Sequence, residues 1–122
     1  MPTVLIIDDD NYFRRRLRTL FDHGSGFDAC VEAENGAEAL AETKRLLPKL
    51  VVLDFSLPDI NGLQLAQKLR AITPELLILM LTTDYSVNIE KKALSFGISA
   101  VFSKLDDLAT LVENARAVCG IE

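Results

Sequence analysis

Several features on which whole classes of protein depend are scarce or missing in this sequence. Its two cysteines, Cys30 and Cys119, are far apart in the sequence and both lie among apolar residues. We therefore expect buried thiols rather than a disulfide or a zinc site. No apolar run approaches the roughly 18 residues of a membrane span, and the first residues resemble no secretory signal. We expect a cytoplasmic protein with no membrane partner.

An excess of basic side chains is also missing. The net charge is −5, from 18 acidic and 13 basic residues, which disfavours direct binding of nucleic acid by this chain. DNA binding by a partner or a further domain stays open. The 122 residues are 49% hydrophobic and 25% charged, an ordinary composition for a folded domain. We expect one domain covering residues 1–122.

Short apolar runs alternate with amphipathic helical patterns along the whole chain. The expected strands lie near residues 4–7, 29–31, 50–53, 76–81 and 100–102. The expected helices lie near residues 13–21, 37–41, 63–72, 87–96 and 108–118. Three of the strand runs are continuously apolar, which is typical of strands buried on both faces of a parallel sheet. The pattern predicts an α/β fold, with one doubly wound, five-stranded parallel sheet and helices on both faces.

Polar side chains follow these strands at their carboxyl ends, where open α/β sheets carry their chemistry. In chain order they are Asp8, Asp9, Asp10, Asp54, Thr82, Thr83, Asp84, Ser103 and Lys104. If the first and third strands are neighbours, three carboxylates converge at one rim, and a hydroxyl and an ammonium group face them.

Each acid alone has an ordinary explanation. Asp10 precedes the first helix and is expected to be its N-cap, and capping or solvation explains Asp8 and Asp9 equally well. Gathering both with Asp54 is different, because like charges about 4 Å apart repel by roughly 4 kcal/mol at an effective dielectric near 20. This favours a cation site. Oxygen ligands without histidine or cysteine suit Mg²⁺, with Mn²⁺ as the alternative.

A hard cation, a carboxylate, a hydroxyl and a lysine are the parts of a phosphoryl-transfer site. Asp54 would attack in line to give an aspartyl phosphate. The metal and Lys104 would offset charge on the phosphoryl oxygens, and Thr82 would hydrogen-bond one of them. A lone lysine would be a solvated surface residue, but Lys104 directly follows a strand whose end faces the acids.

Four segments, in order and in register over the whole chain, resemble one known family. They are residues 4–10, 54–62, 81–84 and 102–104. Together they look like the receiver domains of two-component response regulators, the CheY-like group of flavodoxin-like folds. The resemblance implies the strand order 2-1-3-4-5.

The resemblance also implies a role for each acidic residue at the rim. Asp54 would be the phosphoacceptor. Asp9 would bind Mg²⁺ directly, Asp8 would bind it through water, and the backbone carbonyl of Ser56 would be a further ligand.

For the remaining rim residues, the resemblance makes Thr82 the switch hydroxyl and Lys104 the partner of the phosphate. Ser56 and Asp84 would tune the rate of dephosphorylation. The implied phosphodonor is a sensor histidine kinase or a histidine phosphotransfer protein.

Two positions depart from the family pattern. Val101 stands where the family has its switch aromatic, and strand alternation points the neighbouring Phe102 to the opposite face, into the core. Leu105 stands where the family has a proline after the lysine. A cis bond before a non-proline residue costs about 2.5–4 kcal/mol, so the sequence leaves the geometry after Lys104 open.

The resemblance also bears on output. Phosphorylation would switch the face built from residues 87–96, 100–102 and 108–118, where a partner or a second copy of the chain binds. Residues 26–36 resemble receivers that precede a LuxR/NarL-type helix-turn-helix domain. Because the last predicted helix ends near Cys119, we expect either a stand-alone receiver or one followed by a DNA-binding output domain beyond Glu122.

Three alternatives stay open at this point. A degenerate receiver that takes no phosphate is one alternative, because Val101 and Leu105 depart from the family pattern. An aspartate-nucleophile phosphohydrolase usually has its nucleophile after the first strand, and a flavodoxin-like nucleotide carrier needs a phosphate loop where Asp8 and Asp9 stand. We therefore expect a self-phosphorylating switch rather than a turnover enzyme.

We make further predictions for a basic run, for the single histidine and for one tyrosine. The basic run of Arg14, Arg15, Arg16 and Arg18 is expected to be a solvated helix face, with docking of the phosphodonor as the alternative. His23 lies in a polar loop and is given no role. Tyr85 follows the fourth strand and is expected to pack in its loop.

Overall fold

A computed structural model describes residues 2–22 and 26–121. His23 lies outside the described residues. Along them the chain forms, in order, β1 (Thr3–Ile7), α1 (Asn11–Asp22), β2 (Ala29–Ala33), α2 (Gly36–Leu46), β3 (Leu50–Asp54), α3 (Gly62–Ile72), β4 (Leu77–Thr82), α4 (Val87–Ser95), β5 (Ala100–Ser103) and α5 (Leu108–Val118). The five strands pair in parallel in the order β2-β1-β3-β4-β5. The predicted fold class and strand order are confirmed.

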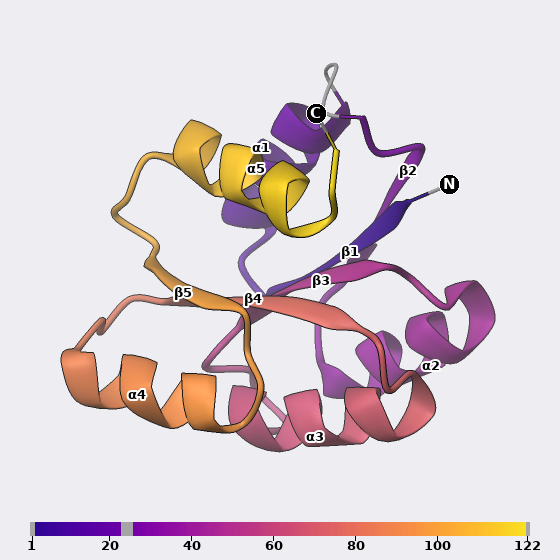
Figure 1. Cartoon of the computed structure of the whole chain (residues 1–122). Helices are drawn as coiled ribbons and strands as arrows, with labels where there is room; N and C mark the ends of the chain where they lie inside the picture. The colour runs from indigo at the N-terminus through magenta and orange to yellow at the C-terminus, as the bar shows by residue number, and fades with distance from the viewer. Residues whose placement is uncertain (1, 23–25, 122) are drawn as a thin grey trace.

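The helices cover the sheet in two layers. Helices α1 and α5 lie on one face, and α2, α3 and α4 lie on the other (Figure 1). Successive strand residues alternate between the two cores, so Leu5 and Ile7 pack under α2 and α3 while Val4 and Ile6 pack under α1 and α5. Full burial on both faces explains the continuously apolar strands, because each such side chain contributes about 1.5–3 kcal/mol when it leaves water.

Strand register aligns the ends that carry the polar residues. Ile7 of β1 pairs with Leu53 of β3, so the residues that follow the two partners are Asp8 and Asp54. On the other side, Asp54 pairs with Leu81 of β4. The carboxyl ends of the central strands therefore meet at one rim.

Several local predictions are confirmed. The carboxylate of Asp10 accepts the backbone N–H groups of Tyr12 and Phe13, at 3.0 and 3.2 Å, and caps α1. Cys30 and Cys119 are buried, unpaired thiols in the core layer under α1 and α5. Burial raises the pKa of Cys30 to about 12, so this thiol is unreactive at neutral pH.

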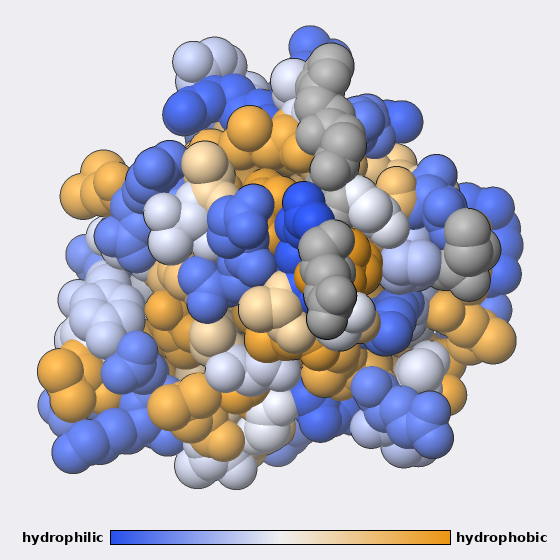
Figure 2. All heavy atoms as spheres, turned by 45° about the horizontal axis from the view of Figure 1, so that its top comes forward, coloured by the Kyte–Doolittle hydropathy of each residue, from blue (hydrophilic) through white to orange (hydrophobic). Residues whose placement is uncertain are grey.

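The outer surface mixes hydrophilic and apolar side chains, as expected from the amino-acid composition. In the view of Figure 2, apolar atoms lie in small groups among hydrophilic side chains. Among the described residues, no helix is both long and apolar enough to cross a membrane.

Candidate functional site

Asp8 follows β1 and is held from several sides. Its side chain is only 1% exposed. Its backbone N–H donates to the carbonyl of Ala33 at 3.1 Å, which continues the pairing with β2. Its carboxylate accepts the N–H of Asp10 at 2.9 Å with one oxygen, and the other oxygen lies 2.7 Å from Nζ of Lys104. The direction of this buried carboxylate is thereby fixed.

Asp54 is the last residue of β3, and its side chain is 7% exposed. One carboxylate oxygen accepts the N–H of Ser56 at 3.2 Å, and the other lies 3.2 Å from Nζ of Lys104. Oxygen atoms of Asp8, Asp9 and Asp54 all lie within 4.8 Å of one another. The structure thus brings together the three acids that the sequence singled out.

Lys104 follows β5 and bridges two of the three acids at the rim. Its N–H donates to the carbonyl of Thr82 at 2.9 Å, which aligns the end of β5 with the end of β4. Its ammonium contacts Asp8 and Asp54 and lies 4.7 Å from the centroid of the Phe13 ring. Burial alone lowers the pKa of Lys104, but the two carboxylates outweigh that effect and hold it above its usual value. We call Asp8, Asp9, Asp54 and Lys104 the acidic site.

One lysine does not balance three carboxylates. Burial, followed by the charge of Asp8, raises the pKa of Asp54 to about 6, although Lys104 and the N–H of Ser56 act in the opposite direction. Ionised Asp54 is therefore held at a cost in free energy within the folded chain. A bound cation would remove that cost.

The donors fit a hard divalent ion. Opposite ligands of octahedral Mg²⁺ lie about 4 Å apart, so carboxylate oxygens within 4.8 Å of one another need only small rotations to share it. Asp9 is exposed and Asp8 and Asp54 are buried, so solvent reaches the cluster beside Asp9 and water can complete the coordination.

The remaining predicted residues surround this cluster. Thr82 ends β4 with its side chain buried, and its hydroxyl oxygen accepts the N–H of Asp84 at 3.1 Å. That bond leaves the hydroxyl proton free to donate to a ligand. Ser56 and Asp84 are both exposed at the rim. Tyr85 is 44% exposed, and a hydrogen bond to Glu90 raises the pKa of its phenol.

The two departures from the family pattern have clear structural outcomes. Val101 is buried in the core layer under α2, α3 and α4, and Phe102 packs in the opposite layer, as strand alternation predicts. Every peptide bond between described residues is trans, including the bond between Lys104 and Leu105. Asp106 orders this turn, because its carboxylate accepts the N–H of Ser103 at 3.0 Å and its own N–H donates back to the Ser103 carbonyl.

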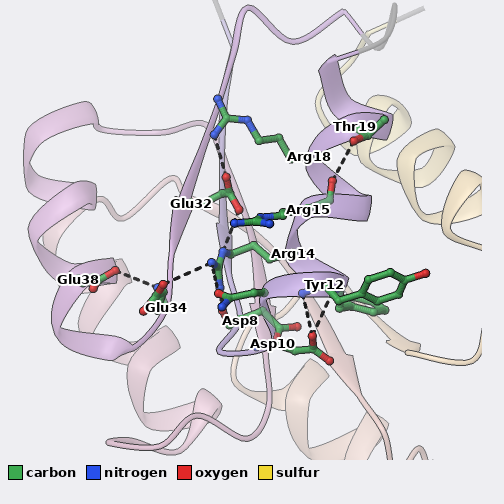
Figure 3. Close-up of polar contacts among 12 residues, drawn as sticks. Asp8, Asp10, Tyr12, Arg14, Arg15, Arg18, Thr19, Glu32, Glu34 and Glu38 are labelled. Carbon is green, nitrogen blue, oxygen red and sulfur yellow. Dashed lines mark hydrogen bonds and ion pairs between the residues drawn. The ribbon is translucent and has the colours of Figure 1, made fainter.

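The prediction of a solvated basic face is wrong for Arg14. Its side chain is 7% exposed, and it contacts Asp8 and Glu32 (Figure 3). Arg15 and Arg16 are exposed, as predicted. A signal was present in the helical phase, since Arg14 is spaced three and seven residues from the buried Leu17 and Phe21.

Asp59 lies in one of the matched segments, but the sequence predicted no role for it. Its carboxylate accepts the N–H groups of Gly36 and Ala37 at 2.9 and 3.1 Å, and these bonds lower its pKa. It thereby ties the loop after Asp54 to the start of α2. At Gly62, the first residue of α3, a Cβ would lie 2.8 Å from the carbonyl oxygen of Asp54, so only glycine fits there.

A doubly wound sheet with three acids and a lysine at its carboxyl rim defines a class of CheY-like proteins. The model of the response regulator receiver domain family matches residues 4–116. The chain belongs to this family and is a receiver domain of the kind found in two-component response regulators.

Relatives of known sequence are longer proteins. A protein of Pseudomonas aeruginosa described as a transcriptional regulator is 35% identical over 118 residues, which cover 97% of this chain and 56% of the relative. The transcriptional activator protein ExaE of Pseudomonas putida is 32% identical over 115 residues, covering 94% of this chain and 54% of the relative. The chain thus spans about half the length of these relatives.

Solved structures agree with the fold. A two-component response regulator of the LuxR family from Aurantimonas sp. SI85-9A1 superposes with a TM-score of 0.88 at 26% identity, covering 98% of this chain and 86% of the other. A CheY-like receiver domain protein from Methanospirillum hungatei JF-1 gives a TM-score of 0.89 at 23% identity, covering 98% and 94%. The second likeness concerns the fold alone.

Proposed function

We propose that this receiver domain is a phosphorylation switch in which Asp54 accepts a phosphoryl group. The observation that carries the proposal is the acidic site, in which Asp54 lies beside two further acids and 3.2 Å from the ammonium of Lys104. An acid cluster alone would be a poor reason, but a lysine at the same point provides the charge that a phosphoryl group requires. The donor is the phosphohistidine of a sensor histidine kinase or a histidine phosphotransfer protein.

In the proposed transfer, the carboxylate of Asp54 is the nucleophile. A carboxylate oxygen attacks phosphorus, the bond from phosphorus to the donor histidine nitrogen breaks, and an aspartyl phosphate forms. Lys104 pairs with the phosphoryl oxygens, and the Thr82 hydroxyl donates its free proton to one of them. Asp8, Asp9, Asp54 and the Ser56 carbonyl would hold Mg²⁺, or Mn²⁺, which would neutralise charge on the phosphoryl group.

Phosphorylation then changes the partners of the two switch residues. The new oxygens compete with Asp8 for Lys104 and with the Asp84 N–H for Thr82, so the ends of β4 and β5 move together. Exposed apolar side chains lie on α4, with Val87 58% and Leu94 47% exposed. We propose that this face, α4-β5-α5, binds a partner or a second copy of the chain. Val101 has no aromatic ring that could couple the acidic site to this face.

Output and location are inferred from the relatives. Because the matching transcription regulators are about twice as long, we propose that residues 1–122 form the receiver unit and that a DNA-binding domain lies beyond Glu122. The receiver itself would work in the cytoplasm without touching nucleic acid. A protein-glutamate methylesterase/protein-glutamine glutaminase of Rhodospirillum rubrum also matches, over 30% of its length. For this chain we propose a switch rather than a turnover enzyme.

Incubation with Mg²⁺ and acetyl phosphate tests the phosphoacceptor proposal. We expect one labile phosphoryl adduct by intact-protein mass measurement, and its loss in Asp54→Asn. Asp84→Asn is the matched control: it changes an exposed rim acid, so the adduct should form with an altered lifetime. No adduct on the unaltered chain would favour a degenerate interaction module, and steady turnover of a small phosphoester would favour a phosphohydrolase.

A further inference from the structure

We infer that Arg14 is a positioning residue for the acidic site, acting on Asp8 and Asp9 through the backbone. Figure 3 shows its side chain reaching from α1 to the end of β1, beside Glu32 of β2. The importance of Arg14 for phosphoryl transfer rests on the proposed function. The effect of Arg14 on the positions of Asp8 and Asp9 does not.

Every nitrogen of the guanidinium has a partner. Nη1 donates to the carbonyl oxygen of Asp8 at 2.6 Å, and Nε donates to Glu32 at 2.8 Å. Nη2 donates to the side chain of Asn11 at 2.5 Å and lies 3.5 Å from Glu34. Because the guanidinium is a planar, rigid fork, these contacts fix both its place and its orientation.

The carbonyl that Arg14 holds belongs to the peptide bond between Asp8 and Asp9. A peptide unit is planar, so holding its oxygen also sets the position of the Asp9 N–H and Cα. Asp9 is exposed, and the point from which its carboxylate reaches toward that of Asp54 is set by where the backbone places its Cα. Arg14 therefore fixes the arrangement of two carboxylates without touching either.

The effect is geometric rather than electrostatic. Glu32 and Glu34 lie next to Arg14, and Arg18 contributes a second cation 2.8 Å from Glu32. We call Arg14, Arg18, Glu32 and Glu34 the α1–β2 cluster. Since each of its cations faces at least one anion, and Arg18 also lies 3.5 Å from Asp22, the cluster adds little net positive field at the acidic site. A lysine at position 14 would keep the charge but could not hold Asp8 and Glu32 together.

Mg²⁺ affinity of the purified chain, measured by calorimetric titration, tests the inference. We expect Arg14→Gln to weaken Mg²⁺ binding by about 10–100-fold, the range for residues that orient metal ligands. Arg14→Lys should also bind more weakly, by at least about fivefold, because the fork and not the charge is required. Arg18→Gln is the matched control: it loses the same Glu32 partner without contacting Asp8, and its affinity should stay within about twofold.

A second readout follows the backbone directly. In amide NMR spectra without metal, Arg14→Gln should shift the Asp9 resonance more than Arg18→Gln does. Unchanged Mg²⁺ affinity in Arg14→Gln, full affinity in Arg14→Lys, or equal losses in Arg14→Gln and Arg18→Gln would each overturn the inference. If Arg14→Gln does not fold, the comparison of Arg14→Lys with Arg18→Lys decides by the same criteria.

The two proposals fail in different ways. Normal Mg²⁺ binding without an aspartyl phosphate would end the phosphoacceptor proposal and leave the role of Arg14 standing. If the chain is phosphorylated but its Mg²⁺ affinity does not depend on Arg14, the positioning role is overturned and the phosphoacceptor proposal stands. Absence of Mg²⁺ binding by the unaltered chain would overturn the positioning role as well.

Discussion

Two polar clusters meet at the turn between β1 and α1, and they differ in charge balance. The α1–β2 cluster pairs two arginines with two glutamates at 2.8–3.5 Å. The acidic site sets three carboxylates against Lys104 alone. The first cluster is complete in the free protein, whereas the second holds a surplus of negative charge. The comparison separates a group of charges that maintains structure from one that is arranged to receive a ligand.

The largest expected effect comes from breaking the balanced cluster. Arg14→Met should lower the free energy of unfolding by about 2–4 kcal/mol, because it removes one member of a buried pair and leaves Glu32 without that partner. Urea denaturation at pH 7 measures this change. A loss below about 0.5 kcal/mol would mean that the pair with Glu32 contributes little.

Removing a charge from the acidic site should raise the free energy of unfolding instead of lowering it. In the absence of Mg²⁺, Asp54→Asn should raise the free energy of unfolding by about 1–3 kcal/mol at pH 7, since it relieves repulsion from Asp8 and Asp9. Urea denaturation at pH 7 without Mg²⁺ measures this change. A destabilised variant would show that Lys104 already compensates for the carboxylates.

The pH dependence sharpens this prediction. The pKa of Asp54 is about 6 in the folded chain, against about 3.9 for an unfolded aspartate. The folded state therefore binds this proton more tightly, and the contribution of Asp54 to stability falls as pH rises between those two values. The gain from Asp54→Asn should be full above pH 6 and vanish below about pH 4. A gain that is constant across this range would contradict the assigned cause.

Mg²⁺ should act on the acidic site and not on the α1–β2 cluster. At ten times its dissociation constant, it should stabilise the unaltered chain by about 1.4 kcal/mol, seen as a higher melting temperature. Asp9→Ala should remove most of this gain while slightly raising stability without metal. Equal stabilisation of Asp9→Ala and the unaltered chain would place the ion elsewhere.

The smallest effect is expected at the edge of the balanced cluster. The side chain of Arg18 is 47% exposed although it lies 2.8 Å from Glu32. Exposed pairs contribute little, so Arg18→Gln should change stability by about 0–1 kcal/mol. A loss as large as that of Arg14→Met would show that the two arginines form one cooperative unit.

The contrast also explains what the sequence could predict. The apolar strands are continuous because both faces are buried, and parallel strands place their carboxyl ends at one rim, so Asp8, Asp54 and Lys104 could be grouped from chain order. The α1–β2 cluster could not be grouped in this way, because it depends on which face of α1 turns toward β2. The helical phase places Arg14, and not Arg15, near the buried face of α1, but only the packing shows that Glu32 and the Asp8 carbonyl lie beside it. Likewise, the bonds from Asp59 to α2 depend on the path of a loop.

The central claim is that Asp54 carries the phosphoryl group. Its most direct test is borohydride reduction of the chain after exposure to Mg²⁺ and acetyl phosphate, followed by peptide mass mapping, since reduction converts an aspartyl phosphate to homoserine. We expect homoserine at position 54 and at no other aspartate. Homoserine at Asp8 or Asp9, or none at all in a chain that binds Mg²⁺, would contradict the account.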